Sequence, residues 1–428
     1  MSRPKPSSGS WVRREKDLEQ LKYVKVMSKL VDKTTYGDLG KALATDYFFL
    51  RQQLSPEQLD YLGRTRRFVD EEVIPVIGGY WERAEFPWPL ARRLGELGLV
   101  GDGLTGYGCP PMDPFGAGLV QMELSRGDGS LGTFVGVQAG LAMRSIAMHG
   151  SEEQKQRWLP AMAKVEKIGA FALTEPEHGS DSIALETSAA RTGDSYVING
   201  SKKWIGNASI ADVVVVWARD AEDREVKGFL IEKGTPGFVA RVIEGKGSLR
   251  AVWQAEIELE NVDIPAENKL PGANSFKDAG RVLVETRSSC AFMALGHAVA
   301  GYDAALTYSK VRKQFGRPLC SFQIVQDRLV KMLAELTAMQ LYCVQIARLA
   351  TEGQLLPTVA GLAKLHNTRK ARQILAEARD LLGGNGILLD FQVIRHMADI
   401  EAVHTFEGTE TIQTLIVGRD ITGVSAFA

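Results

Sequence analysis

The sequence has almost no excess of charge of either sign, because 51 lysines and arginines stand against 52 aspartates and glutamates, for a formal net charge of −1. A strongly basic chain would suggest nucleic acid or an anionic membrane as a partner. The near balance gives no reason to expect either, although it leaves room for a local cationic pocket that binds a phosphate. The 45% share of hydrophobic residues is ordinary for a globular protein.

Cysteine is also scarce. The four cysteines are scattered and form no C-x-x-C pair, at positions Cys109, Cys290, Cys320 and Cys343. This spacing argues against a zinc site and against a disulfide framework. We therefore expect no metal centre, thiols that are mostly buried, and a reducing compartment.

Long apolar runs are missing as well. A membrane-spanning helix needs about 20 apolar residues, and the most apolar segment, from Gly132 to Met148, is interrupted by Gln138 and Arg144. The N-terminus has no apolar stretch like that of a secretory signal, and the last residues are not a peroxisomal tripeptide. We expect no membrane span and a cytoplasmic protein, or one of the mitochondrial matrix or peroxisome in a eukaryote, without a clear targeting signal.

The pattern along the chain predicts an extension followed by three domains. Residues 1–46 mix proline, serine and charged residues and are typical of a partly ordered arm. Residues 47–167 show helical spacing, residues 168–272 show short β-branched runs between turns, and residues 273–428 are helical again. The fold class expected is mainly α with a β insert: an N-terminal α-helical domain, a middle β-domain and a C-terminal helical bundle.

Local signals support this division. Ser55 before Pro56, and Ser151 three residues before Gln154, are typical of helix starts. A stripe of apolar residues spaced three or four apart predicts a long core-facing helix, formed by Leu329, Met332, Leu333, Leu336, Met339, Cys343 and Ile346. Residues 212–217, 226–231 and 255–260 predict strands, and residues 196–200 predict a strand followed by a turn.

Two segments suggest a ligand site. Phe171-Ala-Leu-Thr-Glu-Pro-Glu-His-Gly-Ser-Asp181 is typical of a strand that enters a polar turn, whose N–H groups and hydroxyls suit the edge of a flat ligand. On composition alone, a plain surface turn is the simpler interpretation. Gly200-Ser-Lys-Lys-Trp-Ile-Gly-Asn207 contains Trp204, which could stack on a planar ring, although such a tryptophan is more often part of a core.

Together the two segments resemble signatures of the acyl-CoA dehydrogenase family, L-T-E-P-x-x-G-S-D and G-x-K-x-W-I-x-N. The resemblance extends over about residues 47–427 through four more segments in family order: Gly150-Ser-Glu-Glu-Gln-Lys-Gln-Arg-Trp-Leu-Pro160, Arg312-Lys-Gln-Phe-Gly-Arg-Pro-Leu319, Leu381-Leu-Gly-Gly-Asn-Gly386 and Thr405-Phe-Glu-Gly-Thr409. Six spaced segments in one order make the resemblance specific, whereas any one of them alone would be weak evidence.

The resemblance implies an oxidoreductase of fatty acid β-oxidation that holds FAD between the β-domain and a C-terminal four-helix bundle. It implies flavin contacts from six residues of the first two segments, Phe171, Leu173, Thr174, Ser180, Trp204 and Ile205. It further implies that Arg312, Phe315 and Gln323 reach the FAD of a neighbouring subunit, and hence a homotetramer; the guanidinium of Arg312 suits the pyrophosphate. Gly383, Gly384 and Thr409 complete the expected cofactor-binding set.

Glu407 is the base that the resemblance implies. A carboxylate takes the α-proton of the acyl thioester while flavin N5 takes the β-hydride, and the base's own N–H and a ribityl hydroxyl stabilise the thioester oxygen. On local sequence alone, Glu407 is more simply an acid at a helix N-terminus. Some relatives carry the base one residue before a family arginine, which here is Arg287, but Thr286 precedes it and cannot serve.

The resemblance is greatest to the glutaryl-CoA dehydrogenase group and the plant short-chain acyl-CoA oxidases. Glutaryl-type enzymes hold the distal carboxylate with an arginine, and Gly132 stands at that position here. A buried carboxylate without a partner is costly, so we expect a short, uncharged acyl chain. Arg126, more simply a surface pair with Asp128, and Arg144 are the cations that could compensate. The substrate-binding set expected is Gly132, Thr133, Phe134, Thr286, Arg287, Phe406 and Gly408.

Several functions stay open at this point. The leading one is a dehydrogenase that passes electrons to an electron-transfer flavoprotein. An acyl-CoA oxidase that uses O2 and produces H2O2, and a glutaryl-CoA dehydrogenase, are the alternatives within the family. A non-catalytic CoA-binding scaffold on the same fold is the alternative outside enzymes, although an intact Glu407 and flavin signature argue against it.

Overall fold

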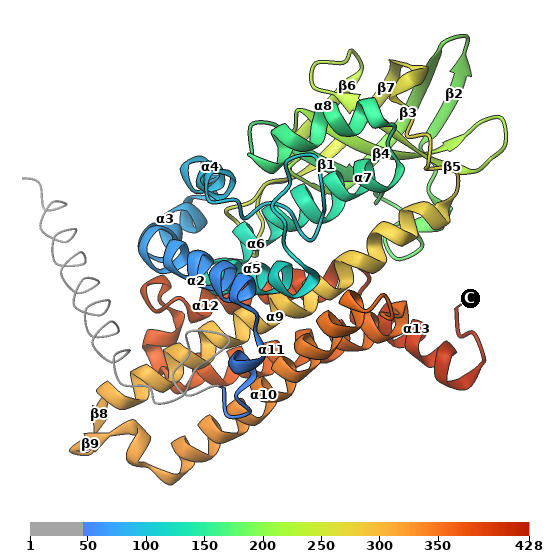
Figure 1. Cartoon of the computed structure of the whole chain (residues 1–428). Coiled ribbons are helices and arrows are strands. Elements are labelled where there is room, and N and C mark those ends of the chain that lie inside the picture. Colours follow the sequence, from blue (N-terminus) through green and yellow to red (C-terminus); the bar gives the residue numbers. More distant parts are fainter. Residues whose placement is uncertain (1–45, 428) are drawn as a thin grey trace, which may run out of the picture.

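The computed structural model describes residues 46–427 of the chain (Figure 1). The extension predicted for residues 1–46 lies outside the described residues, apart from Asp46. That carboxylate accepts hydrogen bonds from the N–H groups of Leu50 and Arg51, at 2.7 and 2.8 Å, and so starts a short 3-10 helix, η2 (Leu50–Gln53).

The first part of the described chain is a layer of helices that ends at Ala163. The predicted starts at Ser55 and Ser151 are confirmed, because each serine caps its helix and the glutamine three residues on bonds back to it. The layer contains α2 (Pro56–Phe68), the π-helical η3 (Val69–Val73), α3 (Ile74–Arg83), α4 (Trp88–Glu96), α5 (Pro114–Gly127), α6 (Gly129–Val135), the π-helical η4 (Gly136–Met143), α7 (Arg144–His149) and α8 (Glu152–Ala163).

The middle part is a seven-stranded sheet. Strand β4 lies beside the edge strand β5, which is antiparallel to it, and β1 and then β2 pair in parallel along its other side. The remaining order is β2-β3-β7-β6. The strands are β1 (Gly169–Ala172), β2 (Ser188–Thr192), β3 (Ser195–Gly206), β4 (Val213–Asp220), β5 (Val226–Glu232), β6 (Phe238–Val242) and β7 (Gln254–Pro265), with the 3-10 turns η5 (Ser182–Ala184) and η6 (Ala266–Asn268).

The predicted strands at 212–217, 226–231 and 255–260 are confirmed as β4, β5 and β7. The turn predicted near residue 200 is wrong, because β3 continues through it to Gly206. The register of β3 against β7 shifts instead between Ile198 and Gly200, where the turn was expected, and again between Lys202 and Ile205, where Trp204 has a left-handed φ of 64°. A bulge, not a chain reversal, explains why turn-forming residues occur inside a strand.

The last part is a set of long helices. They are α9 (Phe276–Val311), α10 (Gln323–Thr351), α11 (Pro357–Leu381), α12 (Val393–Thr405) and α13 (Glu410–Thr422), with the hairpin β8 (Lys313–Gln314) and β9 (Arg317–Pro318) and the 3-10 turns η7 (Leu319–Ser321), η8 (Gly383–Ile387) and η9 (Leu389–Phe391). The predicted apolar stripe of α10 faces the core, although Leu333 is only partly buried. The predicted class, mainly α with a β insert, is confirmed; the domain boundaries stay a prediction.

Two helical segments are long and apolar enough to cross a membrane by length and composition alone, Gly129–His149 and Gln323–Thr351, although the sequence pattern indicated none; a core helix has the same character. The first is 72% buried inside the protein. Its Gln138 donates to the carbonyls of Met162 and Lys167 and accepts from the Gly169 N–H. This segment therefore joins the helical layer to β1 as a core helix.

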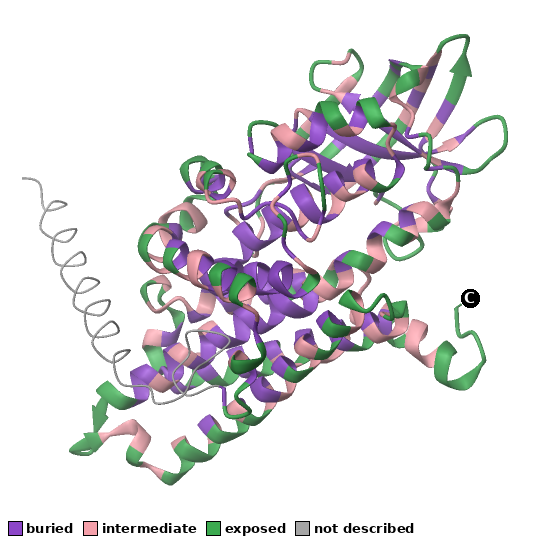
Figure 2. Ribbon diagram, in the orientation of Figure 1, coloured by how far each residue is buried: buried purple, intermediate pink, exposed green. Residues whose placement is uncertain are grey.

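Helices α5 and α9 approach each other at backbone distance. A Cβ on Gly296 would lie 2.1 Å from the Met122 carbonyl oxygen, and a Cβ on Gly118 would lie 2.5 Å from the Phe292 ring. Figure 2 shows the buried residues gathered where these two helices cross and along the sheet. Helix α9 runs from the sheet at one end of the molecule to the β8–β9 hairpin at the other (Figure 1), and this contact holds it against α5 between the two ends.

We predict that Gly296→Ala lowers the free energy of unfolding by about 1–3 kcal/mol or more, because the added methyl group overpacks a backbone contact. Gly280→Ala is the matched control on the same helix, since nothing lies within 4 Å of the position that its methyl group would take; it should be neutral or stabilising through helix propensity. Thermal unfolding of the two FAD-loaded variants measures this, and equal effects would contradict the close contact of α5 and α9.

Candidate active site

Glu407 lies in the turn between α12 and α13. Its φ is 56° and that of Gly408 is 81°, so two successive residues are left-handed. The N-cap of α13 is Thr409, whose hydroxyl accepts from the Ile412 N–H at 3.2 Å. Glu407 therefore belongs to the turn and not to the first turn of a helix, which argues against its interpretation as a simple helix-terminal acid.

The Glu407 carboxylate meets α9 and α11. Thr286 donates its hydroxyl to Glu407 Oε2 at 2.8 Å. Burial raises the pKa of Glu407 above its ordinary value, while the Thr286 hydrogen bond and the positive charges of Lys364 and Arg287 limit the rise. Glu285, beside Thr286, has a side chain that is 50% exposed, with its carboxylate 3.9 Å from Arg144, and it is not among the groups that shift the pKa of Glu407. The turn thus presents one carboxylate of raised basicity.

The carbonyl groups of this turn accept hydrogen bonds from side chains of α11 and α13. Lys364 donates to the carbonyls of Phe406 and Gly408, and Gln413 donates to the carbonyl of Glu407 at 2.9 Å. The Glu407 N–H has no hydrogen-bond acceptor among residues 46–427, so it is available to a ligand. Sequence reasoning found neither Lys364 nor Gln413, since a lysine inside a helix pattern is normally interpreted as a solvent-facing residue.

Arg144 and Asp102 lie on the other side of Thr286. Arg144 donates to the Asp102 carbonyl and, at 3.1 Å, to the Asp102 carboxylate. A Cβ on Gly140 would lie 3.0 Å from that carboxylate and 3.2 Å from the Thr286 methyl group. The charge of Arg144 is therefore already matched by a carboxylate close to the site.

The surface pair expected between Arg126 and Asp128 is wrong. Arg126 is buried and pairs with Glu123 at 2.7 Å and with Asp70 at 2.9 Å. Asp128 is also buried, and it pairs with Arg395. Arg126 is thus paired within the helical layer and Asp128 with α12, because a buried charge needs an opposite partner.

Gly132, Thr133 and Phe134 form part of α6, away from the Glu407 turn. A Cβ on Gly132 would lie 2.4 Å from Ser125 Oγ and 3.5 Å from the end of Met293. Met293 follows Thr286 by two helical turns of α9, about 10 Å. Phe134 is buried with its ring centroid 5.4 Å from that of Phe86, and the buried Thr133 hydroxyl has no hydrogen-bond partner in the described part of the chain.

The first signature segment leaves β1 as a turn fixed by a buried ion pair. Glu175 accepts from Lys202 at 2.9 Å and from the N–H groups of Glu186 and Thr187 at 2.7 and 2.9 Å. Lys202 also donates to the carbonyl of Leu173 at 3.0 Å. The pair joins the two signature segments, a role that their residue types alone did not indicate.

Beside this turn, Trp204 offers an aromatic face. Its side chain is 55% exposed, and the Lys203 N–H donates to the Thr174 carbonyl at 2.9 Å, so the two segments lie together. A strained aromatic residue next to a polar turn fits a flat ring such as that of FAD. Of the other predicted contacts, Ser180 is exposed and Thr174 half-buried, whereas three side chains are buried: Phe171, which packs on Trp217, Leu173 and Ile205.

Apart from Thr409 in the Glu407 turn, the other predicted cofactor residues lie at the opposite end of α9. This helix has 36 residues, about 54 Å at the usual rise. Arg312, Phe315 and Gln323 are exposed near its C-terminal end, where the Phe315 side chain is 94% exposed. Asn385 donates to the Tyr308 hydroxyl at 3.0 Å, which places the exposed pair Gly383 and Gly384 beside the same end. One chain therefore does not bring these residues to its own Trp204 (Figure 1).

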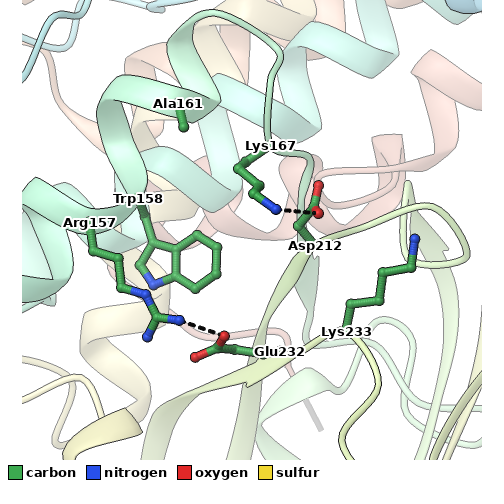
Figure 3. Close-up of a pocket in the computed structure, with 7 residues that line it drawn as sticks. All are labelled: Arg157, Trp158, Ala161, Lys167, Asp212, Glu232 and Lys233. Atoms are coloured by element: carbon green, nitrogen blue, oxygen red, sulfur yellow. Dashed lines mark hydrogen bonds and ion pairs between the residues drawn. The ribbon is translucent and has the colours of Figure 1, made fainter.

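A separate hollow of about 450 Å³ lies between α8 and the sheet (Figure 3). Two exposed ion pairs cross it, Arg157 to Glu232 at 2.6 Å and Lys167 to Asp212 at 3.0 Å. Trp158 and Lys233 complete its walls. None of the residues expected at the catalytic or cofactor site lines this hollow.

The comparisons with known proteins cover most of the chain. Three family models match: "Acyl-CoA dehydrogenase, N-terminal domain" at residues 55–166, "middle domain" at 170–262 and "C-terminal domain" at 276–422. The chain is 34% identical over 381 residues to a short-chain specific acyl-CoA dehydrogenase of Clostridium acetobutylicum, covering 88% of this chain and 99% of that protein. It is 35% identical over 372 residues to the mitochondrial short-chain specific enzyme of Bos taurus, covering 85% and 89%.

Solved structures are similar over the same length. A glutaryl-CoA dehydrogenase from Mycobacterium smegmatis has a TM-score of 0.87 at 42% identity, covering 90% of this chain and 99% of that one. A glutaryl-CoA dehydrogenase from the same organism in complex with FADH2 has a TM-score of 0.88 at 39% identity, with the same coverage. A chain from a study of the electron transferring flavoprotein of Acidaminococcus fermentans has a TM-score of 0.83 at 31% identity, covering 86% and 98%.

Proposed function

The chain belongs to the acyl-CoA dehydrogenase family and is a FAD-dependent oxidoreductase, and we propose that it oxidises a short, uncharged acyl-CoA to the trans-2-enoyl-CoA with Glu407 as the base. The observation that carries this proposal is the Glu407 turn. It combines a carboxylate whose pKa burial raises with a backbone N–H that has no acceptor among the described residues. A carboxylate base and a free N–H donor on one residue suit proton removal next to a carbonyl.

In this reaction the α-proton of the acyl group goes to Glu407 Oε, and the Cα–Cβ double bond forms as the β-hydrogen leaves with its electron pair. FAD, when bound, supplies the acceptor for that hydride. The Glu407 N–H donates to the thioester oxygen as negative charge develops there. Thr286 holds the carboxylate from α9, and Phe406 and Gly408 flank it. Gly408 lets the substrate approach the backbone closely.

The acceptor that reoxidises the enzyme is proposed to be an electron-transfer flavoprotein. The relatives carry the names of dehydrogenases, and a structural neighbour comes from work on such a flavoprotein. H2O2 formation measured against reduction of this acceptor separates a dehydrogenase from an oxidase. A purified protein without flavin would favour a non-catalytic scaffold.

The cofactor site is proposed to be shared between subunits. Trp204, Thr174 and Ser180 lie at the sheet end of α9, and Phe171, Leu173 and Ile205 support them from the core. Arg312, Phe315 and Gln323 lie at the other end and would serve a neighbour's FAD, together with Gly383 and Gly384. Thr409 belongs to the Glu407 turn. Such a site requires closed association, and we propose a homotetramer.

We predict that the FAD-loaded protein sediments as a tetramer and that Arg312→Ala lowers its FAD content, because the guanidinium would bind the FAD pyrophosphate across the interface. Arg317→Ala is the control in the same hairpin, since the Arg317 guanidinium already stacks over Phe322 at 4.1 Å. Analytical ultracentrifugation with flavin absorbance measures both quantities. A stable yellow monomer would show that the site is complete in one chain.

We predict that Glu407→Gln keeps FAD and binds acyl-CoA but slows anaerobic flavin reduction by about 10⁴-fold, because glutamine preserves the side-chain size and the N–H while removing the base. The neighbouring Glu285→Gln is the control, since the Glu285 side chain is half exposed and is not among the groups that shift the pKa of Glu407. Near-normal reduction by the Glu407 variant would show that another residue removes the proton.

The preference for an uncharged acyl chain rests on the cations near α6, which already have partners among the described residues. Gly132 leaves no space for a large side chain, because Ser125 already lies against it. Arg126 forms ion pairs with Glu123 and Asp70, and Arg144 forms one with Asp102. A distal carboxylate buried here would lack a partner, at a cost of about 3 kcal/mol or more.

We therefore predict that butyryl-CoA reduces the flavin with at least about 100-fold higher catalytic efficiency than glutaryl-CoA, and that glutaryl-CoA releases no carbon dioxide. Stopped-flow reduction with both thioesters and detection of carbon dioxide test this. If glutaryl-CoA is the better substrate, Arg144→Ala identifies whether Arg144 leaves Asp102 to bind it.

A further inference from the structure

Lys364 is a buried cation whose hydrogen-bond partners are carbonyl groups of the Glu407 turn. It lies on α11 with 1% of its surface exposed, and it donates to the carbonyls of Phe406 and Gly408. No carboxylate oxygen lies within ion-pair distance of its Nζ among residues 46–427. Burying an ammonium group without a carboxylate partner costs free energy, so the position of Lys364 needs a physical reason.

We propose that Lys364 is a positioning residue of the dehydrogenation, which orients the Glu407 N–H toward the substrate and keeps the Glu407 carboxylate ionised. The proposal rests on the function of Glu407 as the base. Lys364 itself does not touch the reacting atoms, because it approaches the turn from the side of α11.

The orientation follows from peptide geometry. The carbonyl of Phe406 and the N–H of Glu407 belong to one planar trans peptide group, in which they point in opposite directions. Because Lys364 holds that carbonyl on the α11 side, the Glu407 N–H points away from α11. Gln413 holds the next carbonyl, that of Glu407, at 2.9 Å. The successive carbonyls of Phe406, Glu407 and Gly408 are thus all hydrogen-bonded. The direction of the Glu407 N–H is therefore set by side chains that do not contact the substrate.

The second role is electrostatic. Burial raises the pKa of Glu407, and the positive charges of Lys364 and Arg287 oppose this rise. Burial lowers the pKa of Lys364 itself, and the Glu407 carboxylate opposes this fall. Apart from Arg287, the groups that face Lys364 add no charge, since burial raises the pKa of the Cys290 thiol on α9 to about 12 and lowers that of His404 on α12. Asp102, beyond Thr286, is paired with Arg144. Removing the Lys364 charge would raise the pKa of Glu407 further, so Glu407 would stay protonated, and inactive as a base, up to higher pH.

Lys364→Met and Lys364→Gln test both roles in the FAD-loaded oligomer. Anaerobic flavin reduction by butyryl-CoA is followed as a function of pH. For Lys364→Met we expect a loss of about 100-fold at neutral pH, the scale of one misplaced oxyanion donor, and an ascending limb moved to higher pH, so that raising the pH restores part of the rate. Lys364→Gln keeps a donor without the charge, and it should show the pH shift with a smaller loss.

Lys246→Met is the matched control. Lys246 is also a partly buried lysine that holds two backbone carbonyls, those of Leu249 at 2.9 Å and Val252 at 2.6 Å, but in the loop between β6 and β7. Its loss should lower stability and leave the pH profile of flavin reduction unchanged. This comparison separates positioning of Glu407 from a general effect of removing a buried lysine.

The outcomes are distinguishable. If Lys364→Met or, should that variant not fold, Lys364→Gln has a normal rate and pH profile while Glu407→Gln is inactive, the inference about Lys364 is overturned and Glu407 remains the base. If Glu407→Gln reduces flavin normally, the proposed function itself fails. A pH shift equal in the Lys246 and Lys364 variants would also overturn the inference.

Discussion

The backbone contact between α5 and α9 is the constraint on which the rest of the molecule depends. Gly296 lets the two backbones touch and Gly118 makes room for the Phe292 ring, so α9 is held along its middle while both ends carry residues of the proposed site. Thr286 and Arg287 lie near one end and Arg312 near the other. A rigid helix of about 54 Å cannot bring its ends together, and a cofactor that needs both ends must therefore be bound by more than one chain.

The electrostatics of the Glu407 turn reflect two opposed requirements. A base that removes a weakly acidic proton benefits from burial, which raises its pKa. The same burial would leave the carboxylate protonated, and so useless as a base, if nothing opposed it. Thr286, Lys364 and Arg287 oppose the rise from α9 and α11, and none of these three forms a direct ion pair with the carboxylate. A direct ion pair would tie up the oxygens that must receive the proton.

Features that depend on a few neighbouring residues were predictable from the sequence. The caps at Ser55 and Ser151 and the stripe of α10 follow local periodicity and capping chemistry, and both predictions are confirmed.

The prediction of a turn near residue 200 was wrong because glycine and asparagine mark a bulge as readily as a chain reversal, and the pairing of β3 with β7 decides between them. Arg126 was misjudged for a similar reason: Glu123 lies one turn before it on α5, but its second partner Asp70 lies on η3, which only packing brings beside α5. Glu407 and Trp204 were named from a resemblance and not from local pattern, whereas Lys364 gave no local signal at all, since its partners lie about forty residues on.

The left-handed conformation of Glu407 has a physical reason in this arrangement. A non-glycine residue at φ 56° costs about 1–3 kcal/mol and persists only where the surroundings hold it. In an extended or helical turn, the carboxylate and the N–H of one residue would not both be free, because the N–H would continue a ladder or a helix. α12 ends at Thr405, the extended Phe406 takes the Glu407 N–H out of the helix, and the left-handed pair Glu407 and Gly408 follows; Lys364 and Gln413 offset the strain by binding the three carbonyls of this turn. The strained left-handed conformation thus allows a single residue to present both the proposed carboxylate base and an N–H donor to the same thioester.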